Sequence, residues 1–179
     1  MTRTFYEILK PLEENLGLSF LQLAPTFSPR EISYLESFLD HLPTSFKISW
    51  EFRHPDWFRE PHFSQLMTLL RDRDQSLVIT DVAGRRDVLH MGCTTSSTLI
   101  RFVGNALDPS DYQRIEAWAA RIKDWIENGI KYVYLFIHQP DNDLSPDLAA
   151  YFIEILNQKT GLKLNKPRIY RAAVQQKLF

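Results

Sequence analysis

Residues 46–57 read FKISWEFRHPDW, and hydrophobic and polar side chains alternate through the first eight positions, 46–53. In an extended strand, one face carries Ile48, Trp50 and Phe52. The other face carries Ser49, Glu51 and Arg53. One interpretation is a half-buried antiparallel strand with its polar face in water. The other is a strand at the carboxyl edge of a parallel sheet or barrel, with its polar face towards a site. The sharp turn at residues 54–56 favours the second interpretation.

Four further apolar runs predict strands over residues 18–23, 77–81, 99–103 and 132–137. Apolar residues at helical spacing predict helices over residues 5–16, 28–42, 60–72 and 108–129, and a last helix from Ser145. Ser28 and Glu31 have the pattern of a capping box. A long loop is expected between Val82 and Ser97, and an irregular tail over 160–179. We expect residues 1–179 to form a single domain.

Strands and helices alternate strictly along the chain, which indicates a parallel sheet covered by helices. The five predicted strands are centred near residues 21, 49, 79, 101 and 135, so they are separated by 28, 30, 22 and 34 residues. A complete TIM barrel of about 250 residues has about 31 residues per unit. The spacing therefore fits two α/β architectures: a five-stranded doubly wound sheet, or a partial TIM barrel.

The net charge of −1 gives the chain no overall field that would attract nucleic acid or a membrane surface. Cys93 is the single cysteine, so an intrachain disulfide is excluded and a reducing compartment is expected. The N-terminal segment contains acidic residues and no continuous apolar core, unlike a signal peptide. No apolar run approaches the ~18 residues of a membrane span. We therefore expect a cytoplasmic protein with no membrane partner.

Charged side chains fall at or near the carboxyl ends of four predicted strands: Glu51 and Arg53, Asp81, Arg101, and His138. The carboxyl ends of parallel strands meet at one rim, so we expect these side chains on the same edge. Arg101 lies in an otherwise apolar strand, and an unpaired buried guanidinium is costly. Glu51 or Asp81 is its expected partner, in a charged network that also includes Arg53.

Eight residues are candidates for a site at this rim. The expected catalytic residues are Glu51, Asp81 and His138, because carboxylates and imidazoles transfer protons. The expected substrate-binding residues are Arg53, His54, Trp57, Arg101 and Asn105. Arginine suits phosphate or carboxylate groups, and Trp57 would stack on a ring. Structural alternatives stay open: a Glu51–Arg53 ion pair, a solvated turn at His54, and packing of Trp57 against the next helix.

The donor set Glu51, His54, Asp81 and His138 has ligand types that suit zinc or manganese, although its spacing does not indicate a metal site. A divalent metal is therefore the cofactor that the sequence leaves open. The sequence contains no P-loop and no G-x-G-x-x-G, so no nucleotide or flavin cofactor is expected. Arg85 and Arg86 on the long loop are expected to lie in a solvated turn, with an anion clamp as the alternative.

The segments EFRHPDW, LVITD followed by AGRRDVLH, LIRFVGN and YLFIHQPDN occur in this order, with Asp111-Tyr112 and Trp118 before the last. Together they resemble domain-of-unknown-function family 72, the YecE-like proteins, in the form common in Bacteroidetes-type bacteria. The resemblance covers nearly all of residues 5–165 and implies a TIM barrel with no settled activity. Members usually begin with a strand of the type GTSGW-x-Y, which is absent here. The resemblance therefore implies that the first three strands of the barrel are missing.

Three classes of function fit these residues. The first is an enzyme, expected to be a hydrolase, that acts at the rim on a small phosphate- or carboxylate-bearing substrate. The second is nucleic-acid binding or repair, with Trp57 stacking on a base and arginines holding phosphates. The third is a non-catalytic binding module or an inactive, truncated remnant. Strands 18–23 and 132–137 would have exposed edges in a truncated barrel, so self-association is also expected.

Overall fold

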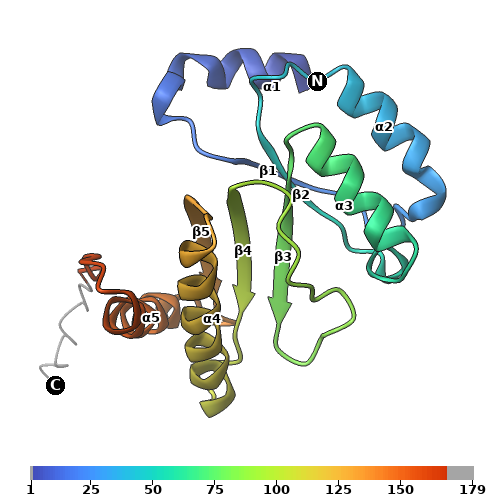
Figure 1. The fold of residues 1–179 in the computed structure, drawn as a ribbon. Coiled ribbons are helices and arrows are strands. Elements are labelled where there is room, and N and C mark those ends of the chain that lie inside the picture. The colour runs from blue at the N-terminus through green and yellow to red at the C-terminus, as the bar shows by residue number, and fades with distance from the viewer. Residues whose placement is uncertain (1, 169–179) are drawn as a thin grey trace, which may run out of the picture. The chain divides into compact units, whose positions relative to one another are not determined.

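The computed structural model describes residues 2–168 (Figure 1). The described residues divide into two compact units, one formed by residues 2–103 and 125–136 and the other by residues 104–124 and 137–168. Within residues 2–168, no helix has both the length and the apolar character needed to cross a membrane. Of the expected tail over 160–179, Thr160 ends helix α5 (Ser145–Thr160), residues 161–168 have no regular secondary structure, and the rest lies outside the described residues.

The strands form a five-stranded sheet in the order β1-β2-β3-β4-β5. Their bounds are β1 (Ser19–Gln22), β2 (Ile48–Glu51), β3 (Ser76–Val82), β4 (Ser97–Val103) and β5 (Tyr132–His138). The first three neighbouring pairs are parallel. A doubly wound sheet reverses its strand order at a switch point, whereas this order follows the chain. The five predicted parallel strands are confirmed, and their order identifies the α/β fold as a partial TIM barrel.

The helices alternate with the strands as predicted: α1 (Thr2–Leu9), α2 (Ile32–Asp40), α3 (His62–Asp72), α4 (Pro109–Glu127) and α5 (Ser145–Thr160). One prediction is wrong, because residues 5–16 do not form a single α-helix. A 3-10 segment, η1 (Lys10–Asn15), follows α1 and contains Glu13 at a left-handed φ of 47°. Pro11 accounts for the break, since proline has no N–H for the helical ladder. The predicted capping box is confirmed, with the Ser28 N–H donating to the Glu31 carboxylate over 2.7 Å.

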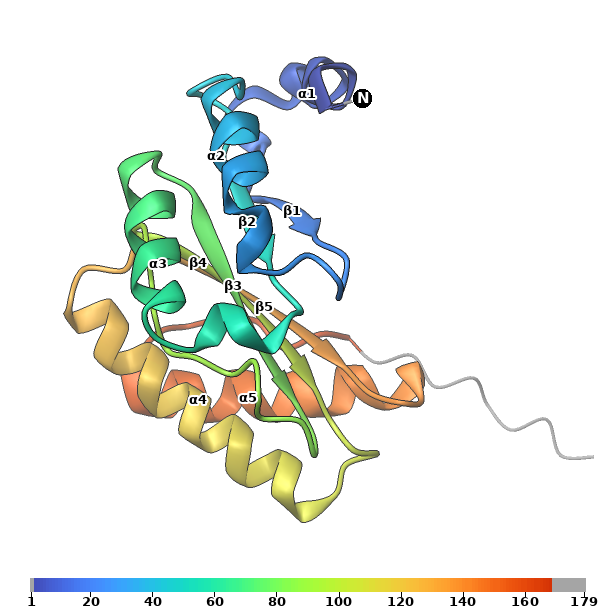
Figure 2. The same cartoon turned by 90° about the vertical axis from the view of Figure 1, so that its right-hand side faces the viewer.

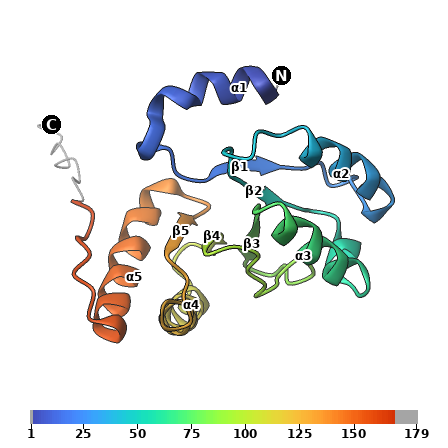
Figure 3. The same ribbon diagram turned by 45° about the horizontal axis from the view of Figure 1, so that its top comes forward.

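One face of the first unit's sheet packs against helices. Figure 2 and Figure 3 both show α2 and α3 on the same side of β2 and β3. The buried side chains that the strands contribute there are Ile48, Trp50, Phe52 and Leu77. The helices contribute Leu35, Leu39, Leu66, Leu69 and Leu70. The predicted alternation in β2 is therefore confirmed, and its polar face is left for the other side of the sheet.

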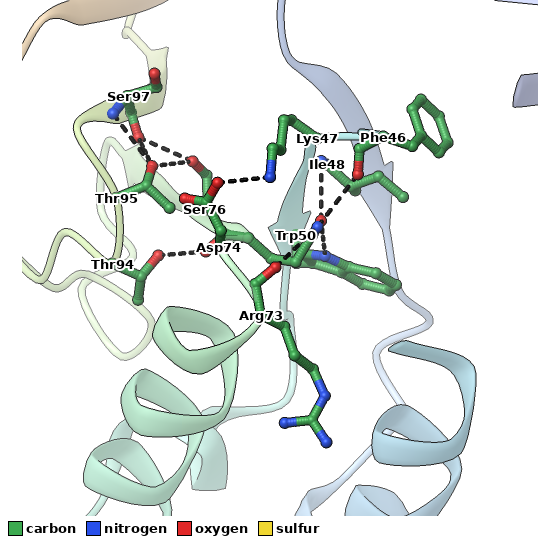
Figure 4. Close-up of polar contacts among 11 residues, drawn as sticks. Phe46, Lys47, Ile48, Trp50, Arg73, Asp74, Ser76, Thr94, Thr95 and Ser97 are labelled. Carbon is green, nitrogen blue, oxygen red and sulfur yellow. Dashed lines mark hydrogen bonds and ion pairs between the residues drawn. The ribbon is translucent and has the colours of Figure 1, made fainter. Parts of the chain in front are cut away.

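Gln75 joins the amino ends of β2 and β3. Its partners Phe46, Ile48 and Trp50 are labelled in Figure 4. Its side-chain oxygen accepts from the Ile48 N–H over 3.0 Å and from Trp50 Nε1 over 3.4 Å. Its Nε2 donates to the Phe46 carbonyl over 3.2 Å. Gln75 is 3% exposed, so one buried amide satisfies three polar groups of the preceding strand segment. This network fixes the end of the sheet opposite to the polar rim.

In the second unit, Asp111 organises the residues that follow β4 and β5. Asp111 is fully buried and accepts from the Asn105 N–H over 2.7 Å and from Gln139 Nε2 over 3.2 Å. Arg114 lies 3.3 Å from the same carboxylate. Gly104 is required at this close approach, since a Cβ there would lie 2.3 Å from Gln139 Nε2. This carboxylate is therefore part of the packing of the second unit.

Candidate functional site

The candidate site lies on the face of the sheet that α2 and α3 leave uncovered. The β1–β2 register places Gln22 beside Glu51, and the β3–β4 register places Thr80 beside Arg101. The β2–β3 register puts both pairs on the same face, because side chains alternate along each strand. Polar side chains from four neighbouring strands therefore gather near one edge of the sheet.

Glu51 and Arg101 form an ion pair on this face. Arg101 Nη1 donates to Glu51 Oε2 although β3 lies between their two strands. Glu51 Oε1 accepts from Gln22 Nε2 over 2.7 Å. The Arg101 guanidinium also lies over the Phe20 ring, 5.3 Å from its centroid. Glu51 is 2% exposed, so the two donors compensate a buried carboxylate, and Glu51 is the one of the two expected partners that pairs with Arg101.

A cavity of about 360 Å³ adjoins this ion pair. Its charged lining consists of Glu51, Arg53, Arg85 and Arg101. The rest of the lining consists of Gln22, Phe52, Thr80, Val82, Val88 and Val103. Arg101 pairs with Glu51 and Arg85 pairs with Asp87, so Arg53 leaves one positive charge at the cavity wall. Its size and charge suit a small anionic molecule.

The Arg53 guanidinium makes no hydrogen bond or ion pair with any residue in the described part of the chain. Glu51, which was one structural candidate for its partner, is engaged by Arg101 and Gln22 instead. The Arg53 backbone carbonyl accepts from Arg85 Nη2 over 3.2 Å. Arg53 is therefore a cavity-lining cation whose charge is available to a ligand.

The loop of residues 83–96 brings Arg85 to the cavity. A bridge between Val82 and Arg85 closes a tight turn, in which Gly84 has a φ of 74° that favours glycine. Arg85 Nε and Nη2 donate to the Asp87 carboxylate over 2.8 Å and 3.3 Å. These hydrogen bonds raise the pKa of Arg85 and lower the pKa of Asp87. The Arg85 side chain thus has a fixed direction at the cavity wall.

His90 anchors the later part of the same loop. Its Nε2 lies 3.0 Å from the Val78 carbonyl, and its Nδ1 accepts from the Gly92 N–H over 3.2 Å. The imidazole stacks on Phe58, with ring centroids 5.4 Å apart, and contacts Phe63. Burial lowers the pKa of His90 to about 4, against a smaller opposing effect of the Val78 carbonyl. His90 is therefore neutral near pH 7, with its proton on Nε2.

The structure does not bring Asp81 together with Glu51 and Arg101. Asp81 is in register with Phe102 and is one residue out of phase with Thr80, so it points to the other side of the sheet. Its side chain is 4% exposed and pairs with Arg86. The expectation of one shared rim network therefore fails at Asp81, because strand parity separates it from Glu51.

His54 and Trp57 also lie away from this cavity. His54 precedes η3 (Pro55–Phe58), where its Nδ1 accepts from the Asp56 N–H over 3.2 Å, and it lines a separate cavity of about 700 Å³. Trp57 is fully buried and stacks on Phe27 at 6.0 Å between ring centroids. Its Nε1 donates to the Phe27 carbonyl over 2.8 Å. Trp57 thus has the packing role of the structural alternative and leaves no face open for a base or ring.

Asn105 and His138 belong to the second unit. The Asn105 N–H donates to Asp111, and the His138 carbonyl accepts from the Gly104 N–H over 2.9 Å. Both contacts are made by backbone atoms, so they give no evidence of a functional role for the Asn105 or His138 side chain.

No group of three or more His, Cys, Asp or Glu side chains among residues 2–168 is arranged to hold a metal ion. The expected donor set of Glu51, His54, Asp81 and His138 therefore does not form a metal site within this range.

Sequence reasoning missed Gln22 and Thr80, which both line the cavity. Thr80 could have been found from strand parity, because it is separated from Asp81 by one position and so faces the opposite side. Gln22 is the last residue of the first strand. Its position beside Glu51 follows from the β1–β2 register, which the sequence alone does not give.

Comparison with known proteins gives one family. The model described as "Protein of unknown function DUF72" matches residues 1–171. The UPF0759 protein YecE of Escherichia coli (strain K12) is 31% identical over 173 residues, which cover 86% of this chain and 63% of that protein. The protein of the same name from Escherichia coli O157:H7 matches to the same extent. This chain therefore spans less than two thirds of the length of these curated relatives.

Two solved structures are similar in fold. A DUF72 family protein from Enterococcus faecalis V583 has a TM-score of 0.72 at 20% identity, covering 88% of this chain and 68% of that chain. A DUF72 family protein from Thermotoga maritima MSB8 has a TM-score of 0.69 at 19% identity, covering 87% of this chain and 64% of that chain. At these identities the likeness shows the fold alone.

Proposed function

The chain belongs to the DUF72 family, whose function is unknown, and we propose that its cavity binds a small phosphate- or carboxylate-bearing molecule and hydrolyses it. The observation that carries the proposal is the Arg53 guanidinium, which lines the cavity without a partner among the described residues. An anionic group of a ligand would supply that partner.

The charge balance of the cavity supports an anion. Glu51 compensates Arg101, and Asp87 compensates Arg85. Arg53 then leaves one positive charge uncompensated at the cavity wall. A planar guanidinium binds phosphate or carboxylate through two parallel hydrogen bonds, so Arg53 suits the anionic group of the ligand. Arg85 uses Nε and Nη2 on Asp87 and on the Arg53 carbonyl, so its Nη1 is the group left to add a hydrogen bond to the same anion.

Glu51 is the proposed acid and base. Each of its oxygens accepts one hydrogen bond from the protein, and a carboxylate has about four acceptor sites in total. A water molecule can therefore hydrogen-bond to Glu51, which takes its proton as the water oxygen bonds to phosphorus or to a carbonyl carbon. The bond from that phosphorus or carbon to the leaving oxygen then breaks, and the leaving oxygen takes the proton from Glu51 while the arginines stabilise the developing negative charge.

Calorimetric titration with inorganic phosphate and with acetate tests the binding step. We expect Arg53→Gln to weaken anion binding by about tenfold or more, since a charge-assisted hydrogen bond contributes about 1.5–3 kcal/mol. The matched control is Arg59→Gln, because Arg59 has a side chain that is 73% exposed and pairs with Asp56 outside the cavity. Equal affinities for the two variants would contradict the assignment of Arg53.

Release of the leaving group from aryl phosphates and aryl esters tests the hydrolytic step. We expect Glu51→Gln to lower the turnover rate by about 10²–10⁴-fold, the usual contribution of a general acid or base. Anion binding without turnover by the unsubstituted chain would support a binding module and contradict the hydrolase. Absence of both binding and turnover would contradict the whole proposal.

A further inference from the structure

The cavity wall is unusually polar. Six of its ten lining residues are polar or charged, whereas small-molecule sites are mostly apolar and the interior of a TIM barrel is usually filled by branched apolar side chains. Phe52 is the single aromatic residue in the lining, and it is 2% exposed. The wall therefore presents hydrogen-bonding groups to a ligand and no open aromatic face.

Thr80 lies in this wall with an unpartnered hydroxyl. The residue is 9% exposed, and its Oγ1 is buried without a hydrogen-bond partner. Leaving a buried hydroxyl unpaired costs about 1–3 kcal/mol. Rotation of the Thr80 side chain about χ1 would bring Oγ1 to a ligand hydroxyl, to which it can donate or from which it can accept.

Gln22 and Glu51 offer acceptors on the two strands before Thr80. Gln22 uses its Nε2 to bind Glu51, and its Oε1 accepts no hydrogen bond within the described part of the chain. Glu51 retains acceptor capacity on both oxygens. Because neighbouring strands lie about 4.8 Å apart, these residues form a row of hydrogen-bonding groups across β1, β2 and β3.

We propose that the ligand of this cavity is a polyhydroxylated anion, a sugar phosphate or a sugar acid. Its anionic group binds Arg53 and Arg85, and its hydroxyl groups bind Thr80, Gln22 and Glu51. The inference rests on the proposed function for the anionic group and adds the chemistry of the rest of the molecule. A nucleoside fits less well, because the lining has no open aromatic surface on which a base would stack.

Calorimetric titration against matched pairs of ligands tests the inference. Glucose 6-phosphate and a panel of other hexose and pentose phosphates are compared with hexyl phosphate, which has the same charged group and no hydroxyls. Glucuronate and other sugar acids are compared with hexanoate in the same way, which separates the two anionic groups. We expect at least one sugar derivative to bind about tenfold or more tightly than its hydroxyl-free counterpart.

Substitutions at Thr80 test whether this residue hydrogen-bonds to the hydroxyl groups of the ligand. Thr80→Val removes an unpaired hydroxyl at nearly constant shape, so we expect it to fold and to reduce the preference for the sugar derivative by about threefold to tenfold. Thr80→Ser retains the hydroxyl and should retain the preference. The matched control is Ser19→Ala, which removes another unpartnered buried hydroxyl outside the cavity.

The possible results separate the two proposals. Equal binding of sugar derivatives and hydroxyl-free anions, or an unchanged preference in Thr80→Val, would overturn the polyhydroxylated ligand and leave anion binding in place. Failure of every anion to bind, inorganic phosphate and hexyl phosphate included, would overturn the anion site and this inference with it.

Discussion

The Arg101 guanidinium on β4 reaches over β3 to the Glu51 carboxylate on β2. The ion pair therefore links β2 to β4 across β3. Its two side chains differ in exposure. Glu51 has a side chain that is 3% exposed, whereas that of Arg101 is 22% exposed. Removal of the arginine should therefore destabilise the fold more than neutralisation of the carboxylate, because it leaves the more buried charge without its ion-pair partner.

We expect Arg101→Met to lower the free energy of unfolding by about 2–4 kcal/mol, and Glu51→Gln to lower it by less. Urea titration followed by circular dichroism measures both. In the double variant the two losses should be clearly less than additive, because residues in direct contact are coupled. Simple additivity would show that the pair contributes nothing as a pair.

Gln75→Leu should destabilise the first unit strongly. Leucine fills the space but leaves the Ile48 N–H, Trp50 Nε1 and the Phe46 carbonyl without their buried partner. We expect a loss of about 3 kcal/mol or more in the free energy of unfolding, measured in urea. Gln65→Leu on the exposed surface of α3 is the control and should change stability by less than about 0.5 kcal/mol. Equal losses for the two variants would contradict the role given to Gln75.

His90 should make stability depend on pH between about 6.5 and 4. The unfolded chain binds a proton on this imidazole near pH 6.5, whereas the folded chain resists protonation until about pH 4. The contribution of neutral His90 to the free energy of unfolding is therefore fully present above pH 6.5. It is lost as the pH drops towards 4, by about 3 kcal/mol in total. Urea unfolding across this range measures the slope.

His90→Gln retains a donor and an acceptor but does not titrate, so it should flatten that slope. The control is His41→Gln, since His41 lies exposed at the end of α2 and bonds the Ser37 carbonyl. A slope that survives in His90→Gln would assign the pH dependence to other groups.

The free edge of β1 should promote self-association of this chain. In the described sheet β1 has β2 as its one neighbour, and the N–H groups of Ser19 and Leu23 bond to that side. By alternation the N–H groups of Phe20 and Gln22 point to the free edge. We expect the sedimentation coefficient to rise with concentration. Phe20→Pro removes one outward donor and should weaken the effect, whereas a monomer at every concentration would contradict the expectation.

Strand positions and strand faces were predictable because local patterns determine them. The alternation in residues 46–52 identified the helix-facing side chains, and the spacing of the strands allowed a partial barrel. The capping box at Ser28 and Glu31 was predictable because both partners lie within one helical turn. Residues 5–16 gave a strong helical pattern, and Pro11 and Glu13 interrupted the helix nevertheless.

The site was less predictable because its contacts depend on register between strands. Arg101 needed an acidic partner, but Glu51 and Asp81 both ended strands, and the parity of β3 relative to β4 decided between them. Trp57 follows a polar turn, and its burial depends on Phe27, which lies thirty positions earlier in the chain. No local pattern contains that information.

The Glu51–Arg101 contact also has a consequence for the order of synthesis. Ribosomes make Glu51 fifty residues before Arg101, so the carboxylate emerges well ahead of its counter-charge. Until Arg101 has been synthesised, the Glu51 carboxylate in the nascent β1–β2 segment has no ion-pair partner with which it could be buried. The carboxyl edge of the sheet should therefore remain hydrated during translation until β4 docks.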